Sequence, residues 1–170
     1  MAKEILDRLR VGTACVRRVV WLIRHHMNFP AAKEVNVVKW LRHLAPEFKD
    51  RQELASAVAQ LLTLREADLR GGKVRPEGRL AENERLRVLV ADVLMRVPFY
   101  PADLALSGRV VARYLGEGPQ VKRVLDDLLR RVQEGSLPNE AEALEKALSG
   151  TESYKRFLVH KENGRERRRV

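Results

Sequence analysis

Arginine residues recur near the start of the chain at spacings that could place several of them along one side of a helix. Arg17 and Arg24 are seven residues apart and share a helical face, and Arg10 could extend their row across a turn. Arg18 adds a further guanidinium group beside Arg17. Such a row can follow the phosphates of a nucleic-acid backbone through charge and position, without reading the bases. The spacing therefore predicts a backbone-binding surface formed by Arg10, Arg17, Arg18 and Arg24.

A second candidate site is the tight turn at residues 115–121, where Gly118 and Pro119 precede an amphipathic helix. The first N–H groups of a helix point outward and carry a partial positive charge, so they can hold a phosphate. Lys122 and Arg123, in the first turn, would add to this attraction, whereas Glu117 would oppose it. We therefore predict backbone contacts at Gly118, Lys122 and Arg123. An ordinary turn between antiparallel helices is the alternative.

The whole chain is strongly basic. Its 170 residues include 33 Lys and Arg against 23 Asp and Glu, which gives a formal net charge of +10. Residues 1–70 contain 13 basic and 8 acidic side chains, and residues 151–170 contain 7 and 3. A charge of this size favours a polyanionic partner, most often nucleic acid. The arginine-rich residues 165–169 are interpreted either as a solvated, frayed end or as a basic arm that contacts phosphates.

Residue types that serve catalysis or metal binding are present but poorly placed. Cys15 lies in an apolar stretch, which favours a buried structural thiol over a nucleophile. His25 and His26 are adjacent, so they point about 100° apart on a helix and cannot chelate one metal ion together. Asp126 and Asp127 lie among basic residues at helical spacing, a pattern typical of a solvated face with ion pairs. We therefore expect neither a catalytic residue nor a metal site.

Composition excludes several classes of protein. The single cysteine rules out an internal disulfide and favours a reducing compartment. The longest uncharged run, residues 54–64, has 11 residues, which is too few to span a bilayer. The first residues enter an amphipathic pattern directly, so we expect no signal peptide and a cytoplasmic location.

Helical periodicity extends over nearly the whole chain, and no segment shows the sustained alternation that is typical of strands. The expected helices cover residues 2–10, 13–27, 33–44, 51–66, 80–96, 109–115, 119–134, 140–148 and 151–163. The glycine-rich segment 71–78 is the expected boundary between two parts, residues 1–72 and 79–150, which a terminal helix and basic tail follow at 151–170. We therefore predict an all-α fold, an irregular helical bundle of two sub-bundles. The second contains a helix-hairpin-helix-like turn.

Individual positions are predicted from capping preferences and helical faces. The expected caps are Thr13, Asp50 and Asn139 at the starts of helices and Gly135 at the end of one. The helix at 119–134 has an apolar stripe at Val121, Val124, Leu125, Leu128, Leu129 and Val132. His26 shares a face with Ile23 and Met27, so we expect it to pack in the core.

Short motifs occur in a fixed order along both halves of the chain. In the second half they are residues 104–108, 118–125 and 135–139, followed by Leu144, and in the first half residues 5–10, 22–27 and 64–68. The second-half motifs resemble the C-terminal region of bacterial tRNA nucleotidyltransferases, the CCA-adding enzymes and related poly(A) polymerases. The first-half motifs are similar to the segment that follows the His-Asp core in members with an HD domain. The similarity covers about residues 3–150. The family usually has a small residue at the position of Lys122 and often proline at that of Glu117.

The resemblance implies a body-like sub-bundle at 1–72 and a tail-like sub-bundle at 79–150, which together grip the tRNA elbow, at the end of the TΨC arm. The family's catalytic head, with its Gly-Ser motif and Asp-x-Asp carboxylates, has no counterpart in these 170 residues. Any Mg²⁺ would belong to that head. We therefore expect the chain to bind tRNA or tRNA-like RNA, without a cofactor of its own and without adding nucleotides alone. It would do so as part of such an enzyme or as a separate short chain.

Two other interpretations stay open. The chain could be a helical protein-protein interaction domain that docks a separate nucleotidyltransferase catalytic domain, its basic surface meeting an acidic protein face. It could also be the remnant of an HD phosphohydrolase that uses His25 or Asp68.

Overall fold

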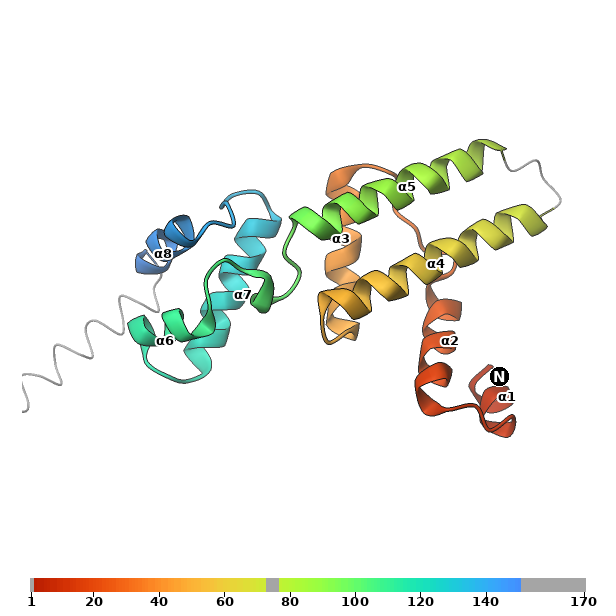
Figure 1. The fold of residues 1–170 in the computed structure, drawn as a ribbon, viewed down its shortest axis with the longest axis horizontal. Coiled ribbons are helices and arrows are strands. Elements are labelled where there is room, and N and C mark those ends of the chain that lie inside the picture. Colours follow the sequence, from red (N-terminus) through yellow and green to blue (C-terminus); the bar gives the residue numbers. More distant parts are fainter. Residues whose placement is uncertain (1, 73–76, 151–170) are drawn as a thin grey trace, which may run out of the picture. The chain divides into compact units, whose positions relative to one another are not determined.

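The computed structural model describes residues 2–72 and 77–150, and all regular structure in these ranges is helical (Figure 1). The all-α prediction is therefore confirmed. Within these ranges the chain forms eight α-helices and two 3-10 helices. The expected helix at 151–163 and the arginine-rich end lie outside the described residues. None of the described helices is both long and apolar enough to cross a lipid bilayer.

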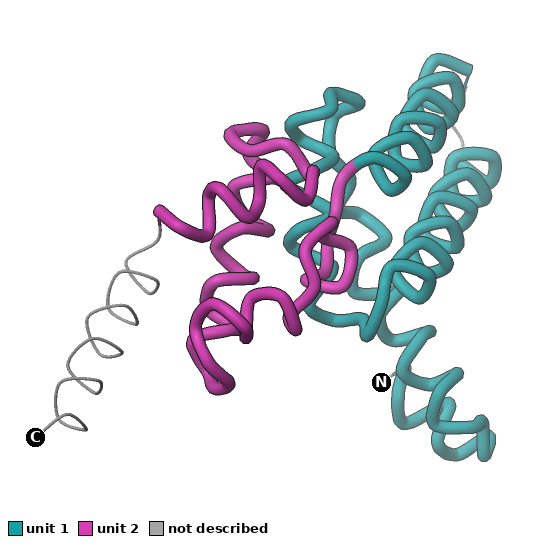
Figure 2. Tube along the Cα trace, turned by 60° about the vertical axis from the view of Figure 1, so that its left-hand side comes forward, with its two compact units in different colours: residues 1–96 teal, residues 97–170 magenta. Residues whose placement is uncertain are grey.

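The chain divides into two compact units, Met1–Arg96 and Val97–Val170 (Figure 2). The sequence predicts a division inside the glycine-rich segment 71–78, whereas the structure places it after the next helix. The helices on either side of that segment pack along one another, so they belong to the same unit.

The first unit is built around two long helices. Its elements are α1 (Ala2–Arg8), α2 (Thr13–His25), α3 (Glu34–Leu44), the 3-10 helix η1 (Ala45–Glu47), α4 (Arg51–Gly71) and α5 (Glu77–Arg96). Figure 1 shows α4 and α5 side by side and antiparallel, with α3 crossing at one end of the pair. Helix α3 contacts α5, and α2 contacts α4, so α4 and α5 form the platform that positions the shorter helices.

Aliphatic side chains on the inner faces of α3, α4 and α5 form the core of this unit. The fully buried ones are Val37, Leu41, Leu44, Leu54, Ala57, Val58, Leu61, Leu62, Leu86 and Val93. Full burial of one such side chain contributes about 1.5–3 kcal/mol relative to exposure. In α3 and α4 these residues recur at helical spacing, so each helix buries one continuous face.

Helix α4 begins where its capping residues predict. Asp50 Oδ1 accepts a hydrogen bond from the backbone N–H of Glu53 at 2.8 Å, and Glu53 Oε2 accepts one from the N–H of Lys49 at 3.1 Å. The first bond satisfies an N–H group that a helix start leaves without an intrahelical partner, and the second ties the residue before the cap to the first turn. The helix continues to Gly71, beyond the predicted end at residue 66, because its inner face stays apolar as far as Leu69.

Helix α2 differs from its prediction in both its cap and its buried face. Gly12 holds the N-cap position and Thr13 is the first helical residue, so the predicted Thr13 cap is wrong. The buried side chains are Val16, Trp21 and His25, whereas Cys15, Ile23, His26 and Met27 are exposed. The predictions of a buried Cys15 and a core His26 are therefore wrong. Apolar residues surround much of this helix, so periodicity alone does not select the face that packs.

The second unit is a smaller bundle. Its elements are the 3-10 helix η2 (Pro101–Asp103), α6 (Gly108–Leu115), α7 (Pro119–Gln133) and α8 (Ala141–Ser149). Helix α7 contacts α6, α8 and η2, so it is the centre of this bundle. Its predicted apolar stripe is confirmed: four of the six positions are buried and Val121 and Val132 pack against the same core.

Two turns of the second unit show how local chemistry ends and starts its helices. Gly135 has φ of +72°, a conformation that glycine adopts without strain, and Ser136 N–H donates to Arg131 O at 3.0 Å. The predicted stop at Gly135 is therefore confirmed. Asn139 is not the cap of α8, since Glu140 holds that position. Its side chain instead accepts from Ala105 N–H at 2.9 Å and donates to Asp103 O at 3.1 Å, which ties together two loops.

Candidate nucleic-acid interface

The first unit contains an open hollow beside α2, which we call the α2 hollow. It has a volume of about 710 Å³. Helix α2 forms one wall, and the segment that joins η1 to α4, with the start of α4, forms the other. Its lining residues are Ala14, Arg17, Arg18, Val20, Trp21, Arg24, Glu47, Phe48, Lys49 and Glu53.

Aromatic packing holds the two walls of the α2 hollow together. The ring of Trp21 meets the ring of Phe48 edge-on, with centroids 5.1 Å apart, and lies 4.8 Å from the ring of His25. Trp21 is only 7% exposed. Phe48 is fixed by its own backbone, since its N–H donates to Ala45 O at 3.1 Å and closes η1. Edge-to-face contacts of this kind favour one rotation of α2, the one that carries its arginines to the hollow.

Three arginines of α2 line the hollow, and they differ in exposure and in their contacts. Arg17 is exposed and has no acidic partner among the described residues. Arg18 is half-buried, and its Cζ lies 5.6 Å from the centroid of the Phe48 ring, a cation–π contact. Arg24 is largely exposed, and its Nη1 lies 3.7 Å from Glu47 Oε2. The hollow therefore presents guanidinium groups with little internal neutralisation.

The two carboxylates that line the hollow are already engaged. Glu47 Oε1 lies 3.3 Å from His25 Nε2, without hydrogen-bond alignment, and its other oxygen faces Arg24. Glu53 Oε2 accepts a hydrogen bond from the backbone N–H of Lys49, the residue before the N-cap Asp50. Arg17, Arg18, Arg24 and Lys49 outnumber these two acids, so the lining has an excess of positive charge.

The structure thus brings three of the four arginines predicted for this surface to one place. Arg10 is exposed in the connection between α1 and α2, with φ of +56°, and is not among the lining residues of the hollow. The prediction from sequence missed Trp21 and Phe48. Trp21 lies one helical turn after Arg17 and Arg18, so helical spacing could have placed it on their face. Phe48 follows a 3-10 turn that is distant in the sequence, and helical periodicity does not predict its position.

The second predicted site, at the start of α7, belongs to the other unit. Gly118 is the N-cap with φ of +142°, and a Cβ there would lie 2.5 Å from Gln120 Oε1. The amide of Gln120 donates to carbonyl oxygens at the end of the preceding turn, including Glu117 O at 3.0 Å. Lys122 and Arg123 are exposed beyond it. This geometry fits a tight structural turn, and the contacts themselves single out no phosphate position.

Several guanidinium groups elsewhere are bound to carboxylates. Arg96 donates to Asp92 at 2.6 Å and to Glu34 at 3.2 Å, and its hydrogen bond lowers the pKa of the Asp92 carboxyl. Arg130 donates to Asp127 at 2.6 Å and to Glu134 at 3.0 Å, and these acids, Asp127 first, raise the pKa of the Arg130 guanidinium. Because their charge is partly neutralised by these carboxylates, Arg96 and Arg130 attract a polyanion less strongly than Arg17 does.

A metal site is not formed by the described residues. Within residues 2–72 and 77–150, no group of three or more His, Cys, Asp and Glu side chains could hold a metal ion. His25 is buried against Trp21, and Asp68 is exposed on α4.

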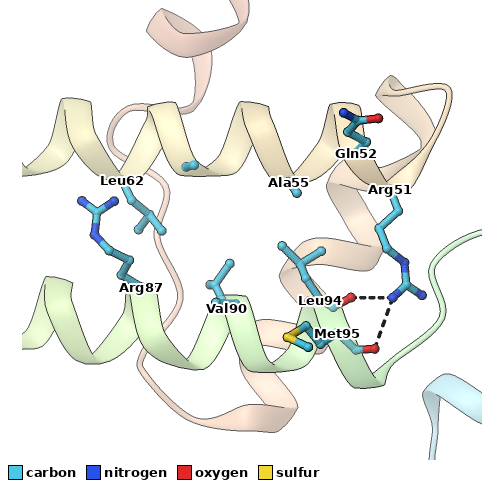
Figure 3. Close-up of a pocket in the computed structure, with 10 residues that line it drawn as sticks. Arg51, Gln52, Ala55, Leu62, Arg87, Val90, Leu94 and Met95 are labelled. Atoms are coloured by element: carbon cyan, nitrogen blue, oxygen red, sulfur yellow. Dashed lines mark hydrogen bonds between the residues drawn. The ribbon is translucent and has the colours of Figure 1, made fainter.

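An apolar groove runs between α4 and α5 in the same unit (Figure 3). It has a volume of about 600 Å³ and is lined by Arg51, Gln52, Ala55, Ala59, Leu62, Arg87, Val90, Ala91, Leu94 and Met95. Small alanines leave the space between the helices unfilled, and Met95 at its edge is 82% exposed. Arg51 closes one end, since its Nη1 donates to Leu94 O at 2.6 Å and to Met95 O at 3.3 Å.

Comparison of the chain with protein-family models, curated proteins and solved structures found no match.

Proposed function

We propose that this chain binds RNA through the surface of α2, with tRNA or a tRNA-like stem as its partner and the TΨC-arm end as the contacted part. The observation that carries the proposal is the gathering of Arg17, Arg18 and Arg24 with Lys49 around one hollow, where they outnumber the two lining carboxylates, Glu47 and Glu53. Contacts to phosphates would supply affinity, and the shape of the helical stem would supply selectivity. No nucleotide addition by this chain alone is part of the proposal.

The charge of the molecule supports this assignment. The net charge of +10 attracts any polyanion, and three of the four basic side chains that line the α2 hollow project from one helix. A guanidinium group donates in a fixed planar geometry that matches phosphate oxygens, which favours a phosphate over a diffuse counterion cloud.

The test is an equilibrium titration of a fluorescently labelled TΨC-arm minihelix with the full chain, followed by anisotropy at several KCl concentrations. For three to four phosphate contacts, the logarithm of the binding constant should fall with the logarithm of salt with a slope of roughly −3. Absence of binding at low salt, or binding that salt does not weaken, would contradict the proposal.

A second candidate function is favoured by the groove between α4 and α5. Its apolar lining and the exposed Met95 fit the apolar face of a helix from a protein partner, such as a separate nucleotidyltransferase catalytic domain. Co-purification with such a domain after nuclease treatment, and loss of the complex on Met95→Asp, would support this function. A complex that Met95→Asp leaves intact would exclude the groove as its interface.

A further inference from the structure

The two long helices of the first unit leave the groove between them open to solvent. Ala59, Ala91 and Met95 line this groove and are exposed. Figure 3 shows the side chains of Val90 and Leu94 directed from α5 toward α4, where Ala55 presents only a methyl group. The groove of about 600 Å³ can therefore receive apolar side chains from another helix.

The same side of α5 carries apolar side chains that protrude. Met95 is 82% exposed and Val88 is 62% exposed. They lie seven residues apart, so they share one side of the helix, with Ala91 between them. We call the groove together with Val88 the α4–α5 face. Because this face has both a hollow and protruding side chains, it can complement itself, which is what an interface between two identical copies requires.

The charge of the α4–α5 face also suits a second copy. Helix α4 contains three arginines and three acidic residues, and α5 contains four of each. The two arginines that line the groove are engaged: Arg51 donates to carbonyl oxygens at the end of α5, and Arg87 Nη2 lies 3.1 Å from Glu66 Oε2. Although the chain has a net charge of +10, these two helices are neutral together. Two copies can therefore meet here without local repulsion, and a polyanion gains little.

We infer that the chain forms a two-fold symmetric dimer through the α4–α5 face, with α5 of each copy lying in the groove of the other. An antiparallel crossing of the two α5 helices near Ala91 sets Val88 of one copy beside Met95 of the second copy. The dimer does not depend on RNA binding. A helix from a nucleotidyltransferase catalytic domain would need the same groove and would compete with the second copy.

The size of the face limits the strength of this dimer. Helices α4 and α5 have 21 and 20 residues, so the face is about 30 Å long and about 20 Å wide. Two such faces would bury roughly 1,200 Å² in total, which is the lower limit for specific interfaces. We therefore expect a reversible dimer with a dissociation constant in the micromolar range.

Sedimentation equilibrium of the nuclease-treated full chain, over low to high micromolar concentrations, measures the association. The average mass should rise with concentration from 19.5 kDa toward twice that value. Higher KCl screens the repulsion between two chains of charge +10 and does not weaken apolar contacts, so the dimer should persist or become tighter. RNA binding should weaken under the same change.

Met95→Asp is the variant that tests the face. It places two carboxylates in the symmetric interface and should raise the dissociation constant more than about tenfold. Met27→Asp is the matched control, because Met27 is 78% exposed just after α2 and lies outside the face. It should leave the dimer unchanged. Circular dichroism shows whether each variant is folded. Val88→Asp repeats the test at a second protruding position, with the same expectation.

The outcomes distinguish this dimer from the proposed functions. A mass that stays at one chain at every concentration would overturn the dimer. A dimer that Met95→Asp and Val88→Asp leave intact, or that Met27→Asp weakens equally, would overturn the α4–α5 face as its interface. Association that high KCl dissolves would do the same. A monomer whose groove binds a helix of a catalytic domain would assign the groove to that partner instead. Minihelix binding by Met95→Asp should be unchanged, since Met95 lies outside the α2 hollow, so RNA binding is measured separately.

Discussion

Replacing Arg17 and Arg24 together by glutamine should weaken binding of the TΨC-arm minihelix and reduce its dependence on salt. Arg17 has no acidic partner among the described residues, so it can make one full phosphate contact. Arg24 faces Glu47 at 3.7 Å with its side chain 66% exposed. An exposed pair of this kind is worth about 0–1 kcal/mol, so a phosphate can compete for Arg24.

The size of the effect follows from the number of phosphates that the double variant can no longer bind. Each phosphate that an arginine neutralises contributes about 0.7–0.9 to the slope of log K against log salt. The double variant should therefore lower the slope by about one to two. At low salt its affinity should fall by about tenfold for each of these phosphates. Anisotropy titrations at four or more KCl concentrations measure both quantities.

A matched control exists in the second unit. The variant Arg130→Gln with Arg131→Gln removes the same charge, but Arg130 is held by Asp127 and Glu134. It should change the binding constant by less than about threefold, an effect of net charge alone. Equal losses in the two double variants would show that overall charge drives binding, and this would refute the role of the α2 surface. Melting curves by circular dichroism confirm that both variants are folded.

Further predictions concern the scaffold, each measured by urea denaturation followed by circular dichroism. Leu61→Ala should destabilise the protein by about 2–5 kcal/mol, because Leu61 is fully buried in the first core, and a loss below about 1 kcal/mol would contradict that burial. Gly118→Ala should cost more than about 1 kcal/mol, since alanine is strained at φ of +142° and its Cβ would meet Gln120. A neutral result would mean that the turn has another conformation. Asp50→Ala should cost about 0.5–2 kcal/mol through loss of the bond from Glu53 N–H, and Asp50→Asn, which keeps an acceptor, should restore most of it.

Much of the helical scaffold could be predicted from the sequence, because its signals are local. The stripe of α7 repeats at 3.6 residues, and Asp50 and Gly135 mark helix ends through their own hydrogen bonds and dihedral angles. These features depend on neighbours within a few residues. Such neighbours are visible in the sequence without knowledge of the fold.

The packed face of α2 could not be predicted in the same way. Its sequence is apolar on several sides, and Trp21 turns inward because Phe48, 27 positions later, provides the surface for it. The same packing buries His25 and leaves His26, which was expected in the core, exposed. Asn139 is a second example. Its side chain could cap a helix, but it instead forms hydrogen bonds to the backbone of Ala105 and Asp103. These outcomes depend on tertiary contacts between distant segments.

The candidate site has both features that could be predicted from the sequence and features that depend on the fold. The spacing of Arg17 and Arg24 was enough to predict that they share a surface. The half-burial of Arg18 against the ring of Phe48 depends on tertiary packing and could not be read from spacing. Arg10 was expected beside them, but α1 ends at Arg8 and Arg10 lies in the connection that follows it.

Ultraviolet crosslinking of the full chain to a TΨC-arm minihelix, with the linked peptides identified by mass spectrometry, would show where RNA lies on this protein. If RNA binds at the α2 surface, the crosslinks should concentrate in α2 and in residues 47–53, the two walls of the α2 hollow, and should be lost in the Arg17 and Arg24 double variant. Crosslinks confined to the groove between α4 and α5, or spread evenly over basic residues of both units, would contradict it.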